Sequence, residues 1–440
     1  MTEAVMTSIP IREVIEGQRV SRVQIYVAIA CAAILFCDAF SLQAVAVAGP
    51  AIRSDLEIEP KMMGIVFSLG LVGMMLGAIL VGPLTERFGH KWPLVFLALW
   101  FSFCTILTVL ADSAWSLAGL RFLDGLGLGA AIPKALALTS EYSATRVRRL
   151  TVSLTMVGYA AGGVAAGFIG AKLVPQGGWH MVFIVSGMLG IGASALVAIV
   201  VPESLNHLVK KPDRIRELQQ IVSVVAPQYA DASSFQATPS SRRSSIFRLF
   251  SPELLFLTLG LWAVAFLAQM DMFLYINWTP IFAEAAGIPL DQSIMINLYY
   301  NAGAMAGIVL VGWAMDRANP AFIIAAALTV ACLSLGAMAI AGLQANLLMA
   351  SSAGVGFGLG GGATGISLLA ATLYDGDVKV TGIGWALGVG RIGSAVGPLI
   401  GGGSMGSGLS VLFVMAAVPA LMAAIFATML GYHLRQSPRP

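Results

Sequence analysis

The sequence predicts an all-α integral membrane protein with twelve transmembrane helices in two six-helix bundles. Hydrophobic residues make up 58% of the 440 residues and charged residues only 11%, against about 25% in soluble domains. The apolar runs are continuous, and most reach the length of about 20 residues that a helix needs to cross the hydrocarbon layer. This composition excludes a water-soluble enzyme.

Twelve apolar stretches are the predicted spans. They lack the alternating pattern of β-strands, and a helix satisfies its own backbone hydrogen bonds in lipid. The stretches are 23–47, 62–82, 92–111, 113–140, 150–171, 179–201, 254–278, 294–315, 320–343, 345–372, 380–403 and 409–430.

The longest connection between predicted spans divides the chain into six spans and six. It predicts an N-terminal bundle over 1–201, a cytoplasmic central loop over 202–252 and a C-terminal bundle over 253–440. Within the loop, 213–225 predicts an amphipathic helix on the membrane surface, and 233–245 predicts a flexible linker. Most lysines and arginines fall on the inner side if both termini are cytoplasmic, as the positive-inside rule requires.

The two halves repeat a motif after their second predicted span. The first half has GPLTERFGHK at 82–91 and the second has GWAMDRANP at 312–320, and both contain Gly-x-x-x-acid-Arg. Charged pairs at helix ends can form in one state and break in another, so we expect a gate there. The residues of this predicted gate are Glu86, Arg87, Asp316 and Arg317.

Ionisable residues inside the predicted spans mark a candidate ion and substrate route. Each would cost about 2.5–3.5 kcal/mol at a helix centre, so each must pair or face water. Arg121 and Asp124 are three residues apart on one helix and can pair. The residues predicted to couple transport to protons are Asp38, Arg121, Asp124 and Asp271.

Arg391 is the predicted anchor for a substrate carboxylate because its guanidinium can bind both carboxylate oxygens. The alternative is a structural ion pair between Arg391 and Asp271. The full predicted substrate set is Arg391, Lys134, Trp385, Tyr299 and Tyr300, although aromatic residues in spans often serve packing alone. Trp278 is predicted to be an anchor at the membrane interface.

The repeated motif and the two six-span halves resemble the major facilitator superfamily. Five segments resemble its aromatic acid:proton symporter branch: CDAFSLQAVAVAGPAI at 37–52, RFLDGLGLGAAIPKALALTSEY at 121–142, PESLNHLV at 202–209, NWTPIFAEAAG at 277–287 and GIGWALGVGRIGSAVGP at 382–398. The resemblance implies import of benzoate-type acids with protons. Asp38 matches the first acid of the family's Asp-Gly-Phe-Asp pattern, whereas Ala39 and Ser41 depart from it. Lys134 stands where the family tends to have asparagine.

The sequence therefore predicts a proton-coupled transporter that imports an aromatic carboxylate by alternating access. We expect a multi-pass protein of the bacterial inner membrane whose partners are the small-molecule acid, protons and the lipid bilayer. A proton-driven exporter and a non-transporting receptor are the alternatives. No enzyme activity, cofactor, metal or nucleic acid is expected, since the histidines are scattered and the glycine runs follow no strand.

Overall fold

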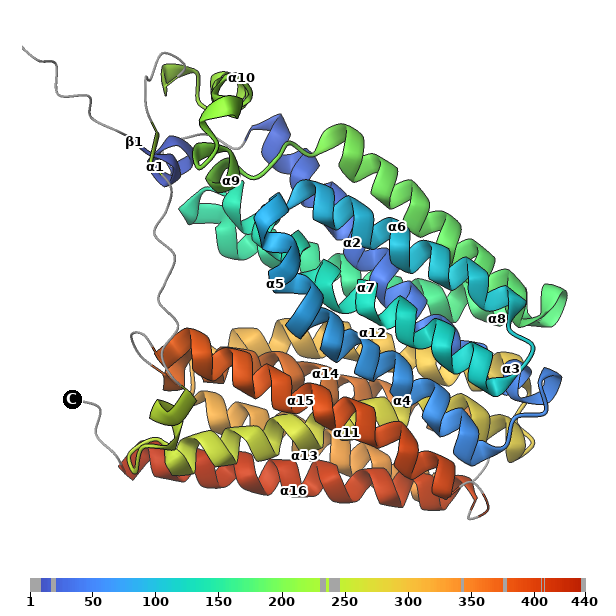
Figure 1. Cartoon of the computed structure of the whole chain (residues 1–440). Coiled ribbons are helices and arrows are strands. Elements are labelled where there is room, and N and C mark those ends of the chain that lie inside the picture. Colours follow the sequence, from blue (N-terminus) through green and yellow to red (C-terminus); the bar gives the residue numbers. More distant parts are fainter. Residues whose placement is uncertain are drawn as a thin grey trace, which may run out of the picture.

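The chain folds into two bundles of long helices that lie side by side (Figure 1). The computed structural model describes residues 9–16, 21–229, 235–236, 246–341, 344–374, 378–404, 406 and 408–436. The first half contains β1 (Ile9–Pro10), α1 (Ile11–Glu16), α2 (Arg22–Val47), α3 (Gly49–Asp55), α4 (Pro60–Leu76), a π turn (Gly77–Val81), α5 (Gly82–Thr85), a 3-10 turn (Glu86–Phe88), α6 (Lys91–Leu107), a further 3-10 turn (Thr108–Leu110), α7 (Ala114–Glu141) and α8 (Thr145–Val200).

The connection and the second half follow the same helical pattern. They contain α9 (Leu205–Val209), a 3-10 turn (Pro212–Arg214), α10 (Ile215–Val225), a 3-10 turn (Pro227–Tyr229), β2 (Phe235–Gln236), a 3-10 turn (Ile246–Phe250), α11 (Leu255–Ala285), α12 (Leu290–Met315), α13 (Pro320–Ala341), α14 (Ala345–Leu373), α15 (Val378–Gly403) and α16 (Leu409–Gln436).

Eleven helices in the described part of the chain are long and apolar enough to cross a membrane. One of them, α8, has 56 residues, and at 1.5 Å per residue a straight helix of that length would measure about 84 Å. Its backbone leaves the helical region at Gly177 and Gly178, where φ of Gly178 is +71°, a conformation that glycine adopts readily. α8 therefore holds the fifth and sixth predicted spans, and the twelve-span prediction is confirmed.

The central connection covers one end of the first bundle. α10 buries Leu218, Val222 and Val225, and the first two join a cluster that includes Ile11 and Leu208. The amphipathic helix is thus confirmed, but its apolar face packs on protein rather than on lipid as predicted. Of the predicted linker, Phe235–Gln236 forms β2, which pairs in parallel with β1, and the rest lies outside the described residues.

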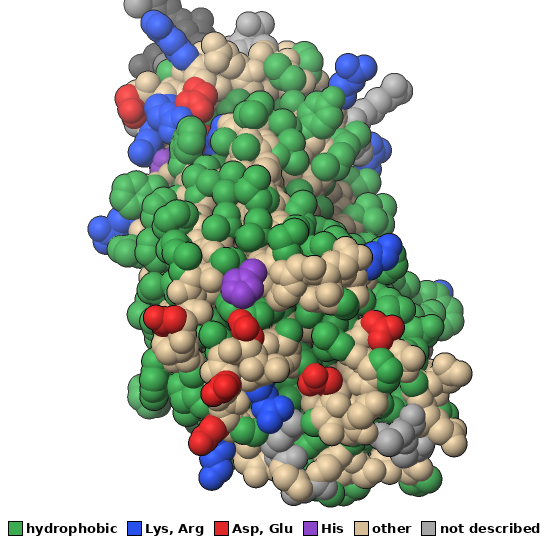
Figure 2. Space-filling model, turned by 90° about the vertical axis from the view of Figure 1, so that its right-hand side faces the viewer, with side chains coloured by type: hydrophobic (Ala, Val, Ile, Leu, Met, Phe, Trp, Pro, Cys, Tyr) green, Lys and Arg blue, Asp and Glu red, His purple; other side chains and the backbone are tan. Residues whose placement is uncertain are grey.

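The two ends of the molecule differ. We call the end where α2 begins and α16 finishes the terminal end, and the end where α2 and α11 finish the opposite end. The bundles meet at the opposite end and diverge toward the terminal end (Figure 1). Figure 2 views the opposite end, where acidic side chains gather; they include Glu57, Glu59 and Glu284 around one surface pocket.

The bundles contact each other closely along α4 and α15. The Ser68 hydroxyl donates a hydrogen bond of 2.7 Å to the Ala395 carbonyl oxygen. A Cβ at Gly64 would lie 2.8 Å from the Pro398 carbonyl oxygen, so a side chain there would not fit. Small residues let membrane helices approach in this way. We call this α4–α15 contact the seam.

Trp278 belongs to the same closed end. It is fully buried, its indole N–H donates to the Pro398 carbonyl oxygen at 2.8 Å, and its ring meets Phe67 edge to face at 5.8 Å. The prediction of an interfacial anchor is therefore wrong, because the helix continues past Trp278 to Ala285 and places it between the bundles.

Replacing Gly64 by valine should shift the protein toward a state in which the opposite end is open. The new side chain would overlap the Pro398 carbonyl, and overpacking of this kind costs about 1–3 kcal/mol, or roughly 5–150-fold in a two-state equilibrium. The measurement is the rate at which a membrane-impermeant maleimide labels a cysteine placed at position 68. The four natural cysteines are first replaced by serine.

Gly336→Val is the matched control, because the structure leaves open space beside that glycine on α13. Its labelling rate should equal that of the parent protein. A Gly64→Val protein that is labelled no faster than the parent would contradict the assignment of the seam as the closing contact.

Candidate functional site

Four charged side chains from three helices lie at the contact between the bundles. They are Asp38 on α2, Arg121 and Asp124 on α7, and Arg391 on α15, and we call them the charge cluster. Asp38 lies within electrostatic range of both Arg391 and Asp124. The cluster therefore joins charges that are hundreds of residues apart in the sequence and belong to both bundles.

The predicted pair between Arg121 and Asp124 is present. Arg121 Nη1 lies 3.1 Å from Asp124 Oδ2, and both side chains are only 3% exposed. The Thr105 hydroxyl donates to Asp124 at 2.9 Å, and Arg121 donates to the Thr108 hydroxyl at 2.8 Å. A buried ion pair is stable only when such added hydrogen bonds offset its desolvation.

Ser41 connects α2 to this pair. Its hydroxyl donates to Asp124 at 3.5 Å and shares a 2.9 Å hydrogen bond with Thr105. In the resembling family this position carries the second acid, which would place a like charge beside Asp124. In this chain a neutral hydroxyl takes that position and donates a hydrogen bond to Asp124. Asp124 therefore has no second carboxylate of α2 beside it.

Asp38 itself is fully buried, and neither of its carboxylate oxygens has a hydrogen-bond partner among the described residues. A buried carboxylate without a hydrogen-bond donor is stable only when it is protonated or lies near a positive charge. The Arg391 guanidinium of the other bundle lies within electrostatic range of Asp38, with no hydrogen bond between the two side chains. This arrangement suits a group that gains and loses a proton.

Arg391 reaches from α15 into the first bundle. Its Nη1 lies 3.9 Å from the Met74 sulfur on α4, and a thioether is a weak acceptor for a guanidinium that has five N–H donors. The predicted alternative of a pair with Asp271 is absent from this conformation, because neither carboxylate oxygen of Asp271 has a hydrogen-bond partner among the described residues.

Two glycines beside Arg391 pack against α11 and leave no room for a ligand on that side. A Cβ at Gly393 would overlap the Phe266 carbonyl oxygen, and one at Gly390 would press on Gln269. Both glycines instead let α15 pack closely on α11. A cavity of about 20 Å³ does border Arg121, Asp124 and Asn277, which is room for one water molecule.

The other predicted substrate residues do not gather at one point. Tyr300 is fully buried, whereas its neighbour Tyr299 is 41% exposed and Trp385 is 45% exposed, with its ring stacked on Trp262 at 5.9 Å. Successive residues on a helix face different directions, so Tyr299 and Tyr300 do not face one common point in this conformation. Lys134 is buried and lies ten residues after Asp124, about 15 Å along α7.

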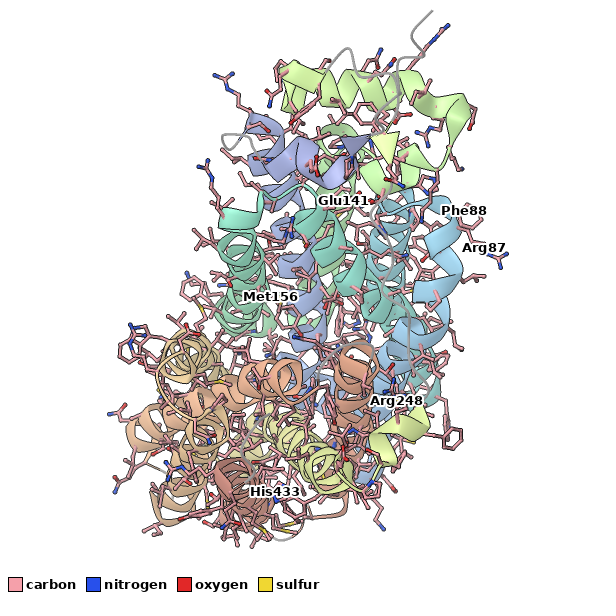
Figure 3. All side chains as sticks on the ribbon, turned by 90° about the vertical axis from the view of Figure 1, so that its left-hand side faces the viewer. Arg87, Phe88, Glu141, Met156, Arg248 and His433 are labelled. Atoms are coloured by element: carbon pink, nitrogen blue, oxygen red, sulfur yellow. The ribbon has the colours of Figure 1, made fainter. Side chains whose placement is uncertain are left out.

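The predicted gate residues lie at the terminal end. Arg87 is exposed and points away from its bundle (Figure 3), and the Glu86 side chain lies outside the described residues. Arg317 donates to the Trp313 carbonyl oxygen at 3.0 Å and covers the Trp313 ring at 4.1 Å. Among the described side chains, Asp316 and Arg317 therefore form no ion pair with each other in this conformation.

A carboxylate that the sequence reasoning missed holds this end of the first bundle. Glu203 Oε1 accepts hydrogen bonds from the backbone N–H groups of His90 at 3.0 Å and Lys91 at 3.1 Å, which begin α6. The Tyr142 hydroxyl donates to the Glu203 carbonyl oxygen at 2.5 Å. Glu203 lies in the segment at 202–209, which carries part of the family resemblance, but no contact of Glu203 could be predicted from that segment alone.

The sequence also gave no sign of a polar contact that crosses between the bundles. Gln43 Nε2 on α2 donates to Asn301 Oδ1 on α12 at 3.1 Å. A Cβ at Gly163 on α8 would lie 2.6 Å from the same oxygen, so a glycine is needed there. An amide pair on two distant helices has no local sequence pattern.

Two helical bundles that meet at one end and share buried charges at their contact define a membrane transporter of the alternating-access class. The chain belongs to the Major Facilitator Superfamily, whose family model matches residues 31–373. The sequence-based assignment to this superfamily is thus confirmed.

Several characterised proteins are similar over nearly the whole chain. The gallate transporter of Pseudomonas putida is 30% identical, covering 98% of this chain and 97% of that protein. The 4-hydroxybenzoate transporter PcaK of Pseudomonas aeruginosa is 33% identical over 93% of each. The benzoate transport protein of Acinetobacter baylyi is 28% identical, covering 98% and 95%. The resemblance to the aromatic acid transporter branch is confirmed.

A solved structure shares the fold. A bacterial homologue of the human lysosomal transporter Spinster, in an inward-facing and unoccupied conformation, superimposes with a TM-score of 0.75 at 15% identity. The match covers 95% of this chain and 99% of that one.

Replacing Arg121 by alanine should destabilise the protein by about 3–5 kcal/mol, because Asp124 would remain buried without its partner. The double variant Arg121→Leu with Asp124→Leu should recover most of this loss, since two apolar side chains leave no buried charge. Thermal unfolding in detergent measures both effects. Arg216→Ala, at an exposed position of α10, is the control and should leave the unfolding temperature unchanged. Equal unfolding temperatures for Arg121→Ala and its parent would contradict a buried ion pair.

Proposed function

We propose that the protein is a symporter that carries an aromatic carboxylate and protons into the cell across the bacterial inner membrane. The observation that carries this proposal is the Arg391 guanidinium, which contacts Met74 of the other bundle and lies within electrostatic range of the buried Asp38 there. The substrate class is supported by relatives that are named for gallate, 4-hydroxybenzoate and benzoate.

The coupling of substrate to protons follows from competition for one positive charge. Without substrate, the Arg391 guanidinium neutralises ionised Asp38. A substrate carboxylate binds Arg391 in two-point geometry, and Asp38 then loses its counter-charge and takes up a proton. Proton and substrate therefore bind together, which is the requirement for symport.

The remaining proposed roles keep the predicted assignments. Asp124 and Arg121 form a fixed pair, and Asp124 lies within electrostatic range of Asp38. Lys134, Trp385, Tyr299 and Tyr300 are proposed substrate contacts, and Tyr300 is the most deeply buried of the three aromatic residues. Trp385 and Tyr299 would need another conformation to reach a ligand at Arg391.

Alternating access is proposed to move the bundles 1–201 and 253–440 about the central loop 202–252. With both termini in the cytoplasm, the closed opposite end faces outward and the open terminal end faces inward. Few basic residues lie near the outward end, as the positive-inside rule requires. Glu86, Arg87, Asp316 and Arg317 are proposed to pair when the terminal end closes, a state in which Arg317 would leave Trp313.

The test is uptake of radiolabelled 4-hydroxybenzoate, benzoate and gallate into proteoliposomes. An inward proton gradient should drive accumulation of at least one acid, by about tenfold per pH unit for each coupled proton. Asp38→Asn should couple one proton fewer, so its accumulation ratio should fall about tenfold for each pH unit of the gradient. Exchange of internal for external substrate should continue.

Asp213→Asn, at an exposed position of the central loop, should accumulate substrate like the wild type. Full accumulation by Asp38→Asn would contradict the role of Asp38. Proton-driven efflux of these acids without uptake would identify an exporter, and binding without any flux would identify a receptor.

Arg391→Lys should fold normally but bind the acid roughly 10–150-fold more weakly, because a two-point contact becomes a single point charge. The neutral amide of the same acid should bind wild type and variant with equal, low affinity. Titration calorimetry on the detergent-solubilised protein measures both. If Arg391→Lys binds the acid as tightly as the wild type, Arg391 is not the group that binds the substrate carboxylate.

A further inference from the structure

A second buried acid lies in the C-terminal bundle, apart from the charge cluster. Asp271, Tyr275 and Thr279 are spaced by four residues on one face of α11, and each is 0% exposed. Asn297 and Tyr300 of α12 and Ser352 of α14 are equally buried. We call these six residues the polar stripe. Its α11 part extends about 12 Å along the helix axis.

The polar stripe leaves an unusual number of hydrogen-bonding atoms without partners. Both carboxylate oxygens of Asp271, the Tyr300 hydroxyl and Asn297 Oδ1 have none among the described residues. Buried polar atoms in proteins are nearly always paired. A line of unpaired oxygens inside a membrane bundle is therefore typical of a path that protons or waters occupy during function.

Other residues of the stripe are fixed by hydrogen bonds and a ring contact. The Tyr275 hydroxyl donates to Ser352 Oγ at 2.7 Å, and the Ser352 hydroxyl donates to the Ile296 carbonyl oxygen at 2.7 Å. The Tyr275 and Tyr300 rings lie 5.3 Å apart. These contacts leave both oxygens of Asp271 without a hydrogen-bond partner among the described residues.

No positive charge among the described residues compensates Asp271. The titratable groups within its electrostatic range are Tyr275 on its own helix, Tyr300 on α12 and Cys332 on α13. An ionised Asp271 would be a bare charge in the bundle interior, unlike Asp38 with its arginine. In this closed conformation the bundle interior therefore accommodates Asp271 as a neutral, protonated carboxylic acid.

The stripe borders the contact that alternating access must break. Tyr300 lies within electrostatic range of Tyr159 on α8 of the other bundle, and half-buried Tyr159 lies within range of Asp38 and Arg391. The next residue, Asn301, accepts the hydrogen bond from Gln43 and donates to the Asn297 carbonyl oxygen at 2.9 Å. Separation of the bundles at the opposite end would break this bridge and admit water to the stripe.

We propose that Asp271 carries a second proton in each transport cycle, in addition to the one on Asp38. A carboxylate oxygen of Asp271 takes the proton from water when the opposite end is open. The same oxygen returns the proton to water when the terminal end is open. This proposal rests on the proposed symport, and it makes the cycle electrogenic, since two protons and one monocarboxylate carry one net positive charge.

The test uses the full-length protein in proteoliposomes at equal internal and external pH, with a potassium gradient and valinomycin to set the potential. The probe is whichever of radiolabelled 4-hydroxybenzoate, benzoate or gallate the wild type accumulates in a proton gradient. An inside-negative potential of about 100 mV should raise wild-type accumulation about 50-fold, the ratio for one net charge. Asp271→Asn should lose this response but keep accumulation driven by a pH gradient.

Two variants complete the test. Asp271→Glu keeps the carboxyl group and should retain the response to potential. Asp291→Asn makes the same substitution at an exposed residue in the first turn of α12 and should behave like the wild type.

The proposal is overturned if accumulation by the wild type does not change with the membrane potential. This measurement needs only the wild type, so it does not depend on purifying Asp271→Asn. It is also overturned if Asp271→Asn still responds to the potential, or if a sodium gradient replaces the proton gradient in an Asp271-dependent way. The proposed symport fails separately, by the absence of proton-driven uptake of all three acids.

Discussion

A positive charge inside a membrane-spanning helix is stable only near an anion, and the rest of the structure depends on this requirement at Arg391. Arg391 lies at the centre of α15, and the carboxylate in its range belongs to Asp38 of the other bundle. The electrostatic interaction therefore crosses the surface along which the bundles move. An anion that replaces Asp38 changes both the protonation of that residue and the force that holds the bundles together, so binding, protonation and movement become one event.

The closed end shows why the movement can be all-or-none. The seam is made of a glycine against a carbonyl oxygen and a serine hydroxyl bonded to another carbonyl oxygen. Such backbone-level contacts fit in one register and have no favourable intermediate positions. Polar atoms on the separated surfaces can bond to water, so the open state of this end is also accessible. Tight packing elsewhere, as at Gly393 against Phe266, keeps each bundle rigid while it moves.

The sequence predicted those features that depend on local pattern. Continuous apolar runs predicted the spans, spacing of three residues predicted the Arg121–Asp124 pair, and apolar spacing predicted α10. Contacts between distant helices could not be predicted, because periodicity says nothing about which helices are neighbours. The sequence left open whether Arg391 pairs with Asp271, and only the structure brings Arg391 within electrostatic range of Asp38. Trp278 was expected at the membrane interface because the apolar run seemed to end there, while the helix continues between the bundles.

The central claim is that substrate carboxylate and Asp38 compete for Arg391, and proton uptake on binding tests it most directly. Purified protein in detergent and weak buffer at pH 8 is mixed with the acid while a pH indicator records the protons taken up. The account predicts uptake of about one proton per substrate bound by the wild type and none by Asp38→Asn, which has no carboxylate to protonate. Substrate binding by the wild type without proton uptake would contradict it.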